Sequence, residues 1–325
     1  MGAITAKKKP LVQKRARAKS RRYAEANWKI RRAKGLQILE APAFKRLAWL
    51  VHGFSTRPGG ASELGHGRAG KTIAGKNLNL GFAEWDTHER VEENRKGFCT
   101  ALGAARMRLA PLSQIHSDVV HIAAGAIASR NEHAPKGDAL ITREPGVLLV
   151  VQTADCIPIL LADTKRRAIA AVHAGWRGTL SRIAAKTIGR MQMEFGTRPE
   201  DVFAALGPGI GRCCYEVDPE LAREFRGQFP NAREWFDGPF DALAVEENDP
   251  NWLPWLTMRP PGHPLPPPRL QLDLIAANRA ILADAGVPAA QISASEFCTS
   301  CRTDLFFSFR RERTTGRMMA AIGIR

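Results

Sequence analysis

Residues 147–179 read VLLVVQTADCIPILLADTKRRAIAAVHAGWRGT, and this stretch decides the fold class. Its apolar, largely β-branched or leucine-rich runs at 147–152, 157–162 and 168–173 have the length and composition of buried strands. The glycine-containing run 175–179 leads into an amphipathic pattern over 180–195, which predicts a helix ended by Gly196. Strands mixed with helices predict an α/β or α+β domain.

The flanking segments extend this pattern on both sides. Further strands are predicted over 47–55, 201–206, 305–310 and 317–324. Helices are predicted over 84–102, with Asp86 or Thr87 as N-cap, and over 272–285, stopped by Gly286. We find no internal repeat, and the loop-like stretch 61–76 and the Pro- and Trp-rich stretch 237–268 are interpreted as surface excursions. We therefore expect a single catalytic domain over 43–325, with an insertion around 237–268.

The net charge of +16 is concentrated at the N-terminus. Residues 1–34 contain 13 Lys and Arg residues against one acidic residue, Glu25, so this segment carries +12 and the rest only +4. We interpret residues 1–42 as a basic, disordered extension, because blocks of like charge are usually disordered. Attachment to nucleic acid or to an anionic surface through residues 1–34, or organelle targeting, are the alternatives.

The composition excludes several classes of protein. Hydrophobic residues make up 44% of the 325, which is enough for a sizeable core, and no run approaches the roughly 20 apolar residues of a membrane span. No apolar segment follows the basic start, as a secretory signal would require. The six cysteines show no regular disulfide framework, so we expect a reducing compartment, the cytoplasm.

Three residues of metal-ligand type lie in short, unusual contexts: His116 in 114–116, Cys156 in 154–156 and His173 in 173–179. A thiolate and two imidazoles suit Zn²⁺, and three protein ligands leave the fourth tetrahedral position open, as in catalytic zinc sites. Each one alone is most simply a core cysteine or a hydrogen-bonded histidine. A Cys156–His173 nucleophilic pair is the main competing interpretation; His116, as a third ligand type, favours zinc.

Further polar residues border these motifs. Arg177 lies at a predicted strand-to-helix turn, where backbone N–H groups favour an anion; a tight turn with Arg177 capping a carboxylate is the alternative. Asp155 can orient a ligand, bind a ribose hydroxyl or act as acid or base; an Asx-turn is the simpler role. Arg57 can reach a pocket beside Gly59 and Gly60 or form a surface salt bridge.

Asn79 and His52 are weaker candidates for binding substrate. Arg310 and Arg311 alternate along a predicted strand, so at most one faces a pocket. Cys213 and Cys214 are interpreted as packing residues. The Cys298–Cys301 pair is weak evidence for either zinc binding or redox chemistry.

The chain also resembles a known family through motifs that occur in the same order over about 45–325. They are VHGFSTRPGG at 51–60, NLG at 79–81, ENR at 93–95, QIH at 114–116, ADC at 154–156, HAGWRG at 173–178, GPGIGRCCYEV at 207–217 and FFSFRR at 306–311. These motifs are similar to those of the YfiH/PgeF-type family, called the laccase-domain or polyphenol oxidase family and described as zinc-dependent purine nucleoside phosphorylases.

The resemblance implies an α/β sandwich with mixed β-sheets, zinc as cofactor (with copper as a substitute), and purine nucleosides and phosphate as partners. It implies phosphorolysis of adenosine, inosine, guanosine or methylthioadenosine, together with adenosine deamination. The family fold is also similar to that of deamidase toxins of the cytotoxic-necrotizing-factor type, which use a Cys–His pair.

Three other functions stay open. A peptidoglycan-precursor editing hydrolase is a role assigned to some relatives, and a nucleic-acid-associated protein without catalysis would use the basic tail. A copper-dependent polyphenol oxidase is disfavoured, because multicopper oxidases use paired His-x-His motifs, and no two of the eight histidines here are separated by one residue.

Overall fold

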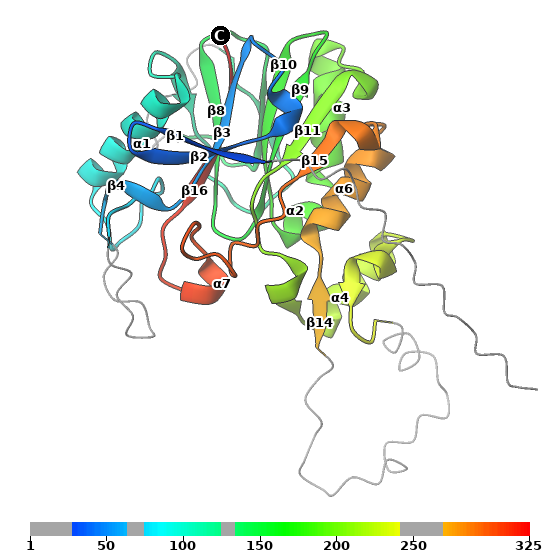
Figure 1. Ribbon diagram of the computed structural model, residues 1–325. Helices are drawn as coiled ribbons and strands as arrows, with labels where there is room; N and C mark the ends of the chain where they lie inside the picture. The colour runs from blue at the N-terminus through cyan, green and yellow to red at the C-terminus, as the bar shows by residue number, and fades with distance from the viewer. Residues whose placement is uncertain (1–27, 64–74, 125–133, 241–268) are drawn as a thin grey trace, which may run out of the picture.

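Two six-stranded β-sheets pack face to face at the centre of the molecule (Figure 1). This computed structural model describes residues 28–63, 75–124, 134–240 and 269–325. The predicted insertion at 237–268 and loop at 61–76 therefore lie largely outside the described residues, as do residues 1–27.

The first sheet has the order β1-β2-β3-β16-β8-β5. Its strands are β1 Lys29–Ala33, β2 Leu36–Glu40, β3 Leu50–Ser55, β16 Met318–Ile324, β8 Val147–Thr153 and β5 Arg108–Ala110. The second sheet has the order β15-β11-β9-β10-β7-β6. Its strands are β15 Ile292–Ala294, β11 Val202–Leu206, β9 Ile157–Asp163, β10 Ala168–Ala174, β7 Ala139–Thr142 and β6 Val120–Ile122.

Both sheets are mixed. Most neighbours are antiparallel, but β5 pairs with β8, β11 with β15 and β6 with β7 in parallel. A small third sheet joins β12 Glu216–Val217, β14 Leu270–Leu272 and β13 Phe236–Asp237, and β4 Pro58–Ser62 lies beside the first sheet. This architecture confirms the predicted α/β sandwich with mixed sheets.

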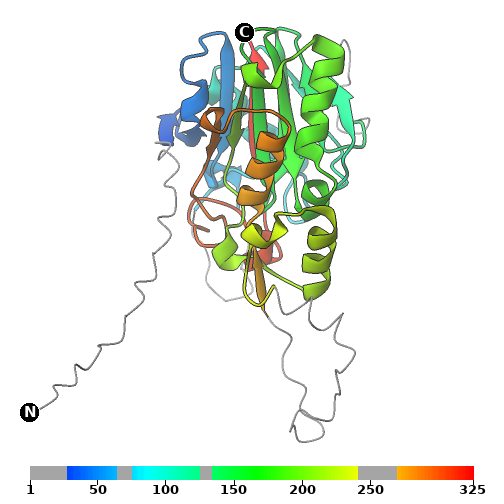
Figure 2. The same ribbon diagram turned by 90° about the vertical axis from the view of Figure 1, so that its right-hand side faces the viewer.

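Helices cover the outer faces of the two sheets (Figures 1 and 2). Helix α1 His88–Leu102 packs on the first sheet, whereas α3 Ile183–Phe195 and α6 Leu274–Asp284 pack on the second. Successive strand residues point to opposite faces, so Leu160 of β9 enters the core between the sheets while Leu161 faces the helices. This four-layer packing explains why the central strands are apolar along their whole length.

The predicted helices are present with shifted boundaries. Helix α1 begins after Thr87, whose hydroxyl accepts the backbone N–H of Arg90, in agreement with the expected cap. The predicted helix over 180–195 is in fact two helices, α2 Trp176–Leu180 and α3, because Arg182 takes a left-handed conformation with φ of 58°. Helix α3 ends at Gly196, as expected. Helix α4 Pro219–Gln228 was not predicted.

Two expectations about the chain ends differ from the structure. The predicted strand at 305–310 is wrong: Ser308 caps a short helix, α7 Phe309–Glu312, by accepting the backbone N–H of Arg311. Arg310 and Arg311 therefore do not alternate along a strand. At the N-terminal end, β1 and β2 join the first sheet, so its strands begin within the range 1–42 assigned to the extension. None of the helices in the described ranges has the length and apolarity needed to cross a lipid bilayer.

Candidate functional site

His116, Cys156 and His173 come together at one end of the sandwich, beside the ends of the central strands β9 and β10. Cys156 directly precedes β9 and His173 is near the end of β10, and the antiparallel pairing of Ala174 with Ile157 places these two ends side by side. His116 comes from the loop between β5 and β6. The Cys156 Sγ lies 3.9 Å from His116 Nε2, and one donor atom from each of the three residues lies within 4.8 Å of the others. The three residues predicted from sequence therefore converge.

Asp138 orients this group from behind. Its Oδ1 accepts a hydrogen bond from His173 Nδ1 at 2.8 Å. This leaves Nε2 as the ring nitrogen that can bind a metal ion. The same carboxylate accepts the backbone N–H of His116 at 3.1 Å and that of Ser117 at 2.6 Å. It therefore fixes one histidine by its side chain and the other by its backbone, at a left-handed φ of 59° for His116. Carboxylate partners of this kind orient metal-ligating histidines.

The electrostatics of the site favour a thiolate. Burial alone would raise the pKa of Cys156, but the charge of His173 and hydrogen bonds from His116 and His173 outweigh it and lower the pKa to about 6. Burial likewise acts to lower the pKa of His173, but the Cys156 thiolate and Asp138 raise it to about 9. Although its burial acts in the opposite direction, the Asp138 carboxyl keeps a pKa of about 2, because His173 and Ser117 hydrogen-bond to it.

Gly175 leaves room for the sulfur. A Cβ atom at this position would lie 2.9 Å from Cys156 Sγ and 3.3 Å from His116 Cδ2. A side chain here would force the sulfur or the turn to shift, so glycine lets the chain leave β10 and enter α2 close to the two donor side chains. The three residues are graded in exposure: His173 is buried, Cys156 is half-buried and His116 is exposed, so the group opens towards solvent on the His116 side.

The donor set fits one divalent metal ion. In a tetrahedral zinc site, nitrogen and sulfur ligands are about 3.6 Å apart, given bonds of about 2.0 and 2.3 Å. The observed 3.9 Å between Cys156 Sγ and His116 Nε2 is close to this separation. Two imidazoles and one thiolate are also the ligand types that zinc and copper prefer.

Asp155 lies beside this group in a strained and well-held conformation. Its φ is 94°, and its Oδ1 accepts the hydroxyl of Thr299 at 2.7 Å while Oδ2 accepts the backbone N–H of Arg310 at 2.6 Å. The carboxylate thus ties the β8–β9 loop to two segments near the C-terminus. A non-glycine residue at positive φ costs free energy, and such strain is concentrated at functional sites.

Arg177 is exposed in α2, with its guanidinium 4.3 Å from the centre of the Trp176 ring. The expected long helix dipole behind it is missing, because α2 has five residues and stops before Arg182. Any affinity for an anion must therefore come mainly from the Arg177 charge and from the first backbone N–H groups of the turn.

Arg57 and Asn79, which are predicted from sequence to bind substrate, both make contacts that link loops. Arg57 is buried, with Nη1 2.7 Å from Glu312 Oε1 and Nε 2.9 Å from Asn77 Oδ1, so its ion pair is internal rather than superficial. The Asn79 amide donates to Gly81 O and Asp86 Oδ2 and accepts from the backbone N–H of Gly81 and Arg317. Both side chains therefore hold loops together. In Asn79, these contacts satisfy both the oxygen and the nitrogen of the side-chain amide.

His52 lies elsewhere, in the middle of β3. Its Nε2 accepts the backbone N–H of Ala41 at 3.1 Å, and its ring packs edge-on against Phe44. It lines a surface hollow with Phe44, Leu50 and Leu102, apart from the three donor residues. Burial lowers the pKa of His52 to about 4.

Tyr215, Asp138 and Arg317 lie next to the site but were not predicted from sequence to act there. Tyr215 lies within electrostatic reach of Cys156, Asp155 and Arg177; burial and the negative charges raise its pKa, so the phenol stays protonated. Arg310 lies over the Tyr215 ring at 5.1 Å. Half-buried Arg317 has a pKa lowered by burial and raised in part by Cys156 and Asp155. Tyr215 and Arg310 belong to quoted motifs, which were signals for them; Asp138 and Arg317 had none.

The fold and site define an α/β sandwich protein with a His–Cys–His group at the ends of two central strands, β9 and β10. The profile of the family described as "Multi-copper polyphenol oxidoreductase laccase" matches residues 51–325. The chain therefore belongs to this family, which confirms the membership indicated by the motifs.

Named relatives agree with this assignment. A protein of Deinococcus radiodurans named "Purine nucleoside phosphorylase" is 39% identical over 90% of this chain and 94% of its own length. The crystal structure of YlmD from Geobacillus stearothermophilus superposes with a TM-score of 0.72 at 33% identity, covering 92% of this chain and 99% of YlmD. "Adenosine deaminase RL5", from an unknown prokaryotic organism, is 37% identical over 54% of this chain and 56% of its own length.

Proposed function

We propose that this protein is a zinc-dependent purine nucleoside phosphorylase that also deaminates adenosine at the same site. The observation that carries the proposal is the open group of three donor residues, His116, Cys156 and His173, oriented by Asp138, in a chain of this family. The names of the relatives, both phosphorylase and deaminase, support the two reactions.

A zinc ion held by His116, Cys156 and His173 would supply a Lewis acid with an open coordination position. Asp138 keeps His173 in the tautomer that such binding requires and holds the loop that carries His116. Gly175 keeps the space around Cys156 Sγ free of a side chain.

The surrounding charges suit phosphate and a ribose that becomes cationic. Arg177, exposed at the α2 turn, binds phosphate, and Arg310 and Arg317 add positive charge around Tyr215 and Cys156. The Asp155 carboxylate, fixed by Thr299 and Arg310, stabilises the positive charge that develops on the ribose as the glycosidic bond breaks. The protonated Tyr215 phenol donates a hydrogen bond to the departing purine.

Copper oxidation of phenols has weaker support. The family description names multicopper chemistry, and copper outcompetes zinc at most sites of this ligand type. Among the described residues, two groups of potential ligands converge, and only the one with His116 and His173 contains histidine. A single such site holds one copper ion, whereas multicopper oxidases need several histidine-rich centres.

The test uses purified protein of measured zinc and copper content, incubated with adenosine with and without phosphate. Mass spectrometry should show adenine and ribose 1-phosphate only when phosphate is present, and inosine in both conditions. Cys156→Ser should abolish both, whereas Cys99→Ser, a change in α1 outside the site, should leave them intact. Full turnover by Cys156→Ser, or by protein free of zinc, would overturn the proposal.

A further inference from the structure

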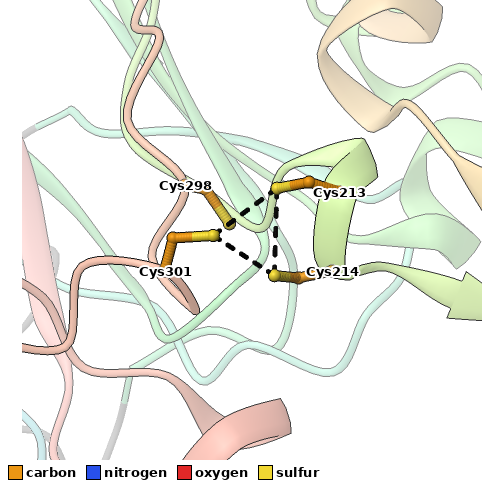
Figure 3. Close-up of side chains that lie close together, drawn as sticks. All are labelled: Cys213, Cys214, Cys298 and Cys301. Carbon is orange, nitrogen blue, oxygen red and sulfur yellow. Dashed lines mark hydrogen bonds between the residues drawn. The ribbon is translucent and has the colours of Figure 1, made fainter.

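Four cysteines outside the His–Cys–His group converge at a second place in the molecule (Figure 3). Cys213 and Cys214 lie in the 3₁₀ turn Arg212–Cys214 that follows β11, and Cys298 and Cys301 lie in the turn that follows β15. Their four sulfur atoms lie within 4.8 Å of one another. From sequence, Cys213 and Cys214 are interpreted as packing residues and Cys298–Cys301 as a pair without a partner. The structure supplies that partner.

We propose that Cys213, Cys214, Cys298 and Cys301 form a structural tetrathiolate zinc site. Cys301 Sγ lies 3.6 Å from Cys213 Sγ and 3.4 Å from Cys214 Sγ, and the two adjacent cysteines are 3.8 Å apart at their sulfurs. In a zinc tetrahedron with bonds of about 2.3 Å, the sulfurs are about 3.8 Å apart. The separations thus match a single central ion, and they are too short for thiolates spread around a cluster of several irons.

The backbone around the sulfurs is shaped for this purpose. The N–H of Gly211 donates to Cys298 Sγ at 3.2 Å, a contact that stabilises a thiolate ligand. A Cβ at Gly211 would lie 3.1 Å from Cys298 Cβ and 3.4 Å from Cys213 Sγ, so this glycine lets the two turns approach closely. One turn thus presents an adjacent pair of cysteines and the other a CxxC pair. The CxxC spacing is common in structural zinc sites.

Simple packing explains the four cysteines less well. Cys213 and Cys301 are exposed and Cys214 is half-buried; only Cys298 is buried. Core packing gives no reason to place three partly exposed thiols in mutual contact. Four thiolates around one ion close the coordination shell, which is typical of structural rather than catalytic zinc.

The location of the cluster gives it a role in the proposed active site. Thr299, between the two cysteines of the CxxC pair, donates its hydroxyl to Asp155 Oδ1 and its backbone N–H to Gly209 O. Gly209 and Ile210 lead directly to the other cysteine pair, and the Ile210 N–H donates to Asp155 O at 2.7 Å. A metal ion that joins the two turns therefore fixes both segments that hold Asp155 next to Cys156.

The experiment counts zinc in the full chain, purified and reconstituted under reducing conditions and then desalted. We expect two zinc ions per chain in the wild type, and one in Cys301→Ser and in Cys298→Ser. Cys156→Ser should also keep one, which isolates the four-cysteine site from the proposed catalytic site. Cys99→Ser, outside both groups, should keep two. Unchanged zinc content in Cys301→Ser and Cys298→Ser would overturn the proposal, whatever the outcome for Cys156→Ser.

A second measurement needs no variant, so misfolding of a variant cannot obscure the result. Alkylation of the folded wild type, followed by peptide mass mapping, should show Cys213 and Cys301 protected in the zinc-loaded protein and reactive after chelation. Cobalt(II) loaded into Cys156→Ser should give the intense sulfur-to-metal charge-transfer absorption of a tetrathiolate centre. Equal alkylation with and without zinc, or a disulfide among the four cysteines in the reduced preparation, would overturn the proposal.

Discussion

At the scale of single residues, Asp138 holds the site together, since its carboxylate binds both His173 Nδ1 and the backbone of 115–117. We predict that Asp138→Asn lowers zinc affinity about ten- to hundredfold, the usual cost of losing such a partner. Competition with a chromophoric chelator measures this. Asp118→Asn, which removes a nearby carboxylate paired with Lys186, is the control and should retain wild-type affinity. Equal affinities in the two variants would contradict the role assigned to Asp138.

His52 gives a prediction about pH. Its pKa is about 4 in the folded protein and about 6.5 when exposed, so the unfolded chain binds the proton first as the pH falls. Stability is therefore lost between about pH 6.5 and 4, by up to about 3 kcal/mol. His52→Gln keeps an acceptor for Ala41 N–H but does not titrate, so its stability should fall less over this range. Urea unfolding at several pH values measures the stability of each variant, with His88→Gln, at an exposed histidine, as the matched control. If the stability of His52→Gln depends on pH as that of the wild type does, His52 is not the group responsible.

The three candidate metal ligands, His116, Cys156 and His173, could be predicted from sequence. Histidine and cysteine are few in this chain, and each of the three lies in an unusual motif or at the end of a predicted strand. Asp138 could not, because a single aspartate before a strand has no distinctive pattern. The internal contacts of Arg57 and Asn79 could not be predicted either, for a different reason. Their motifs are distinctive, but their partners Glu312 and Arg317 are more than 200 residues away in sequence, and no local rule reveals such contacts.

At the scale of elements, the passage from β10 into α2 limits what the site tolerates. Gly175→Ala would place a Cβ 2.9 Å from Cys156 Sγ, so the thiol or the turn must shift. We predict that this variant folds but retains less zinc at the His–Cys–His site and loses most of its turnover. Zinc content is measured in the Cys301→Ser background, which isolates this site from the four-cysteine cluster. Adenosine turnover is measured in the chain that keeps all four of those cysteines, because their turns hold Asp155.

Gly189→Ala is the matched control for that change. Gly189 lies in α3, and a Cβ added there would meet nothing within 4 Å, so alanine should leave zinc binding intact. It should also stabilise the helix by about 0.5–1 kcal/mol, since glycine is unfavourable in a helix interior. If Gly175→Ala retains zinc as well as Gly189→Ala does, the turn is not as tightly constrained as the geometry indicates.

Predicted elements followed their local patterns closely except where a tertiary contact intervened. Strands β8, β9 and β10 lie within a residue or two of their predicted bounds, because uninterrupted apolar runs specify strands buried on both faces. The strand predicted over 305–310 does not form, because Asp155 Oδ2 accepts the Arg310 N–H and Ser308 caps a helical turn. The Asp155 contact comes from 155 residues away and cannot be inferred from local sequence.

At the scale of the whole molecule, the core between the two sheets holds the strand ends that carry the site. Leu160 of β9 is fully buried there, four residues from Cys156. We predict that Leu160→Ala lowers the free energy of unfolding by about 2–5 kcal/mol, because it removes transfer free energy and leaves a cavity. Denaturant unfolding measures this against Met193→Ala, a 79% exposed position in α3 that should change stability by less than about 0.5 kcal/mol. Similar midpoints for the two variants would contradict this account of the core.

The overall architecture was predictable from the family motifs and the apolar runs, whereas the grouping of the four cysteines was not. An adjacent pair and a CxxC pair lie more than 80 residues apart in sequence, and only the approach of the segments after β11 and β15 brings them into contact. The same convergence places Thr299 against Asp155, so the proposed structural and catalytic sites are in direct contact through this hydrogen bond.

The central claim, that the His–Cys–His group is a zinc-dependent catalytic centre, is tested most directly by restoring zinc to metal-depleted protein. Phosphate-dependent release of adenine from adenosine should return in the wild type in proportion to zinc bound at this site. It should also return in Cys99→Ser, and it should not return in Cys156→Ser at any zinc concentration. Turnover by the metal-depleted wild type, or its restoration in Cys156→Ser, would contradict the account.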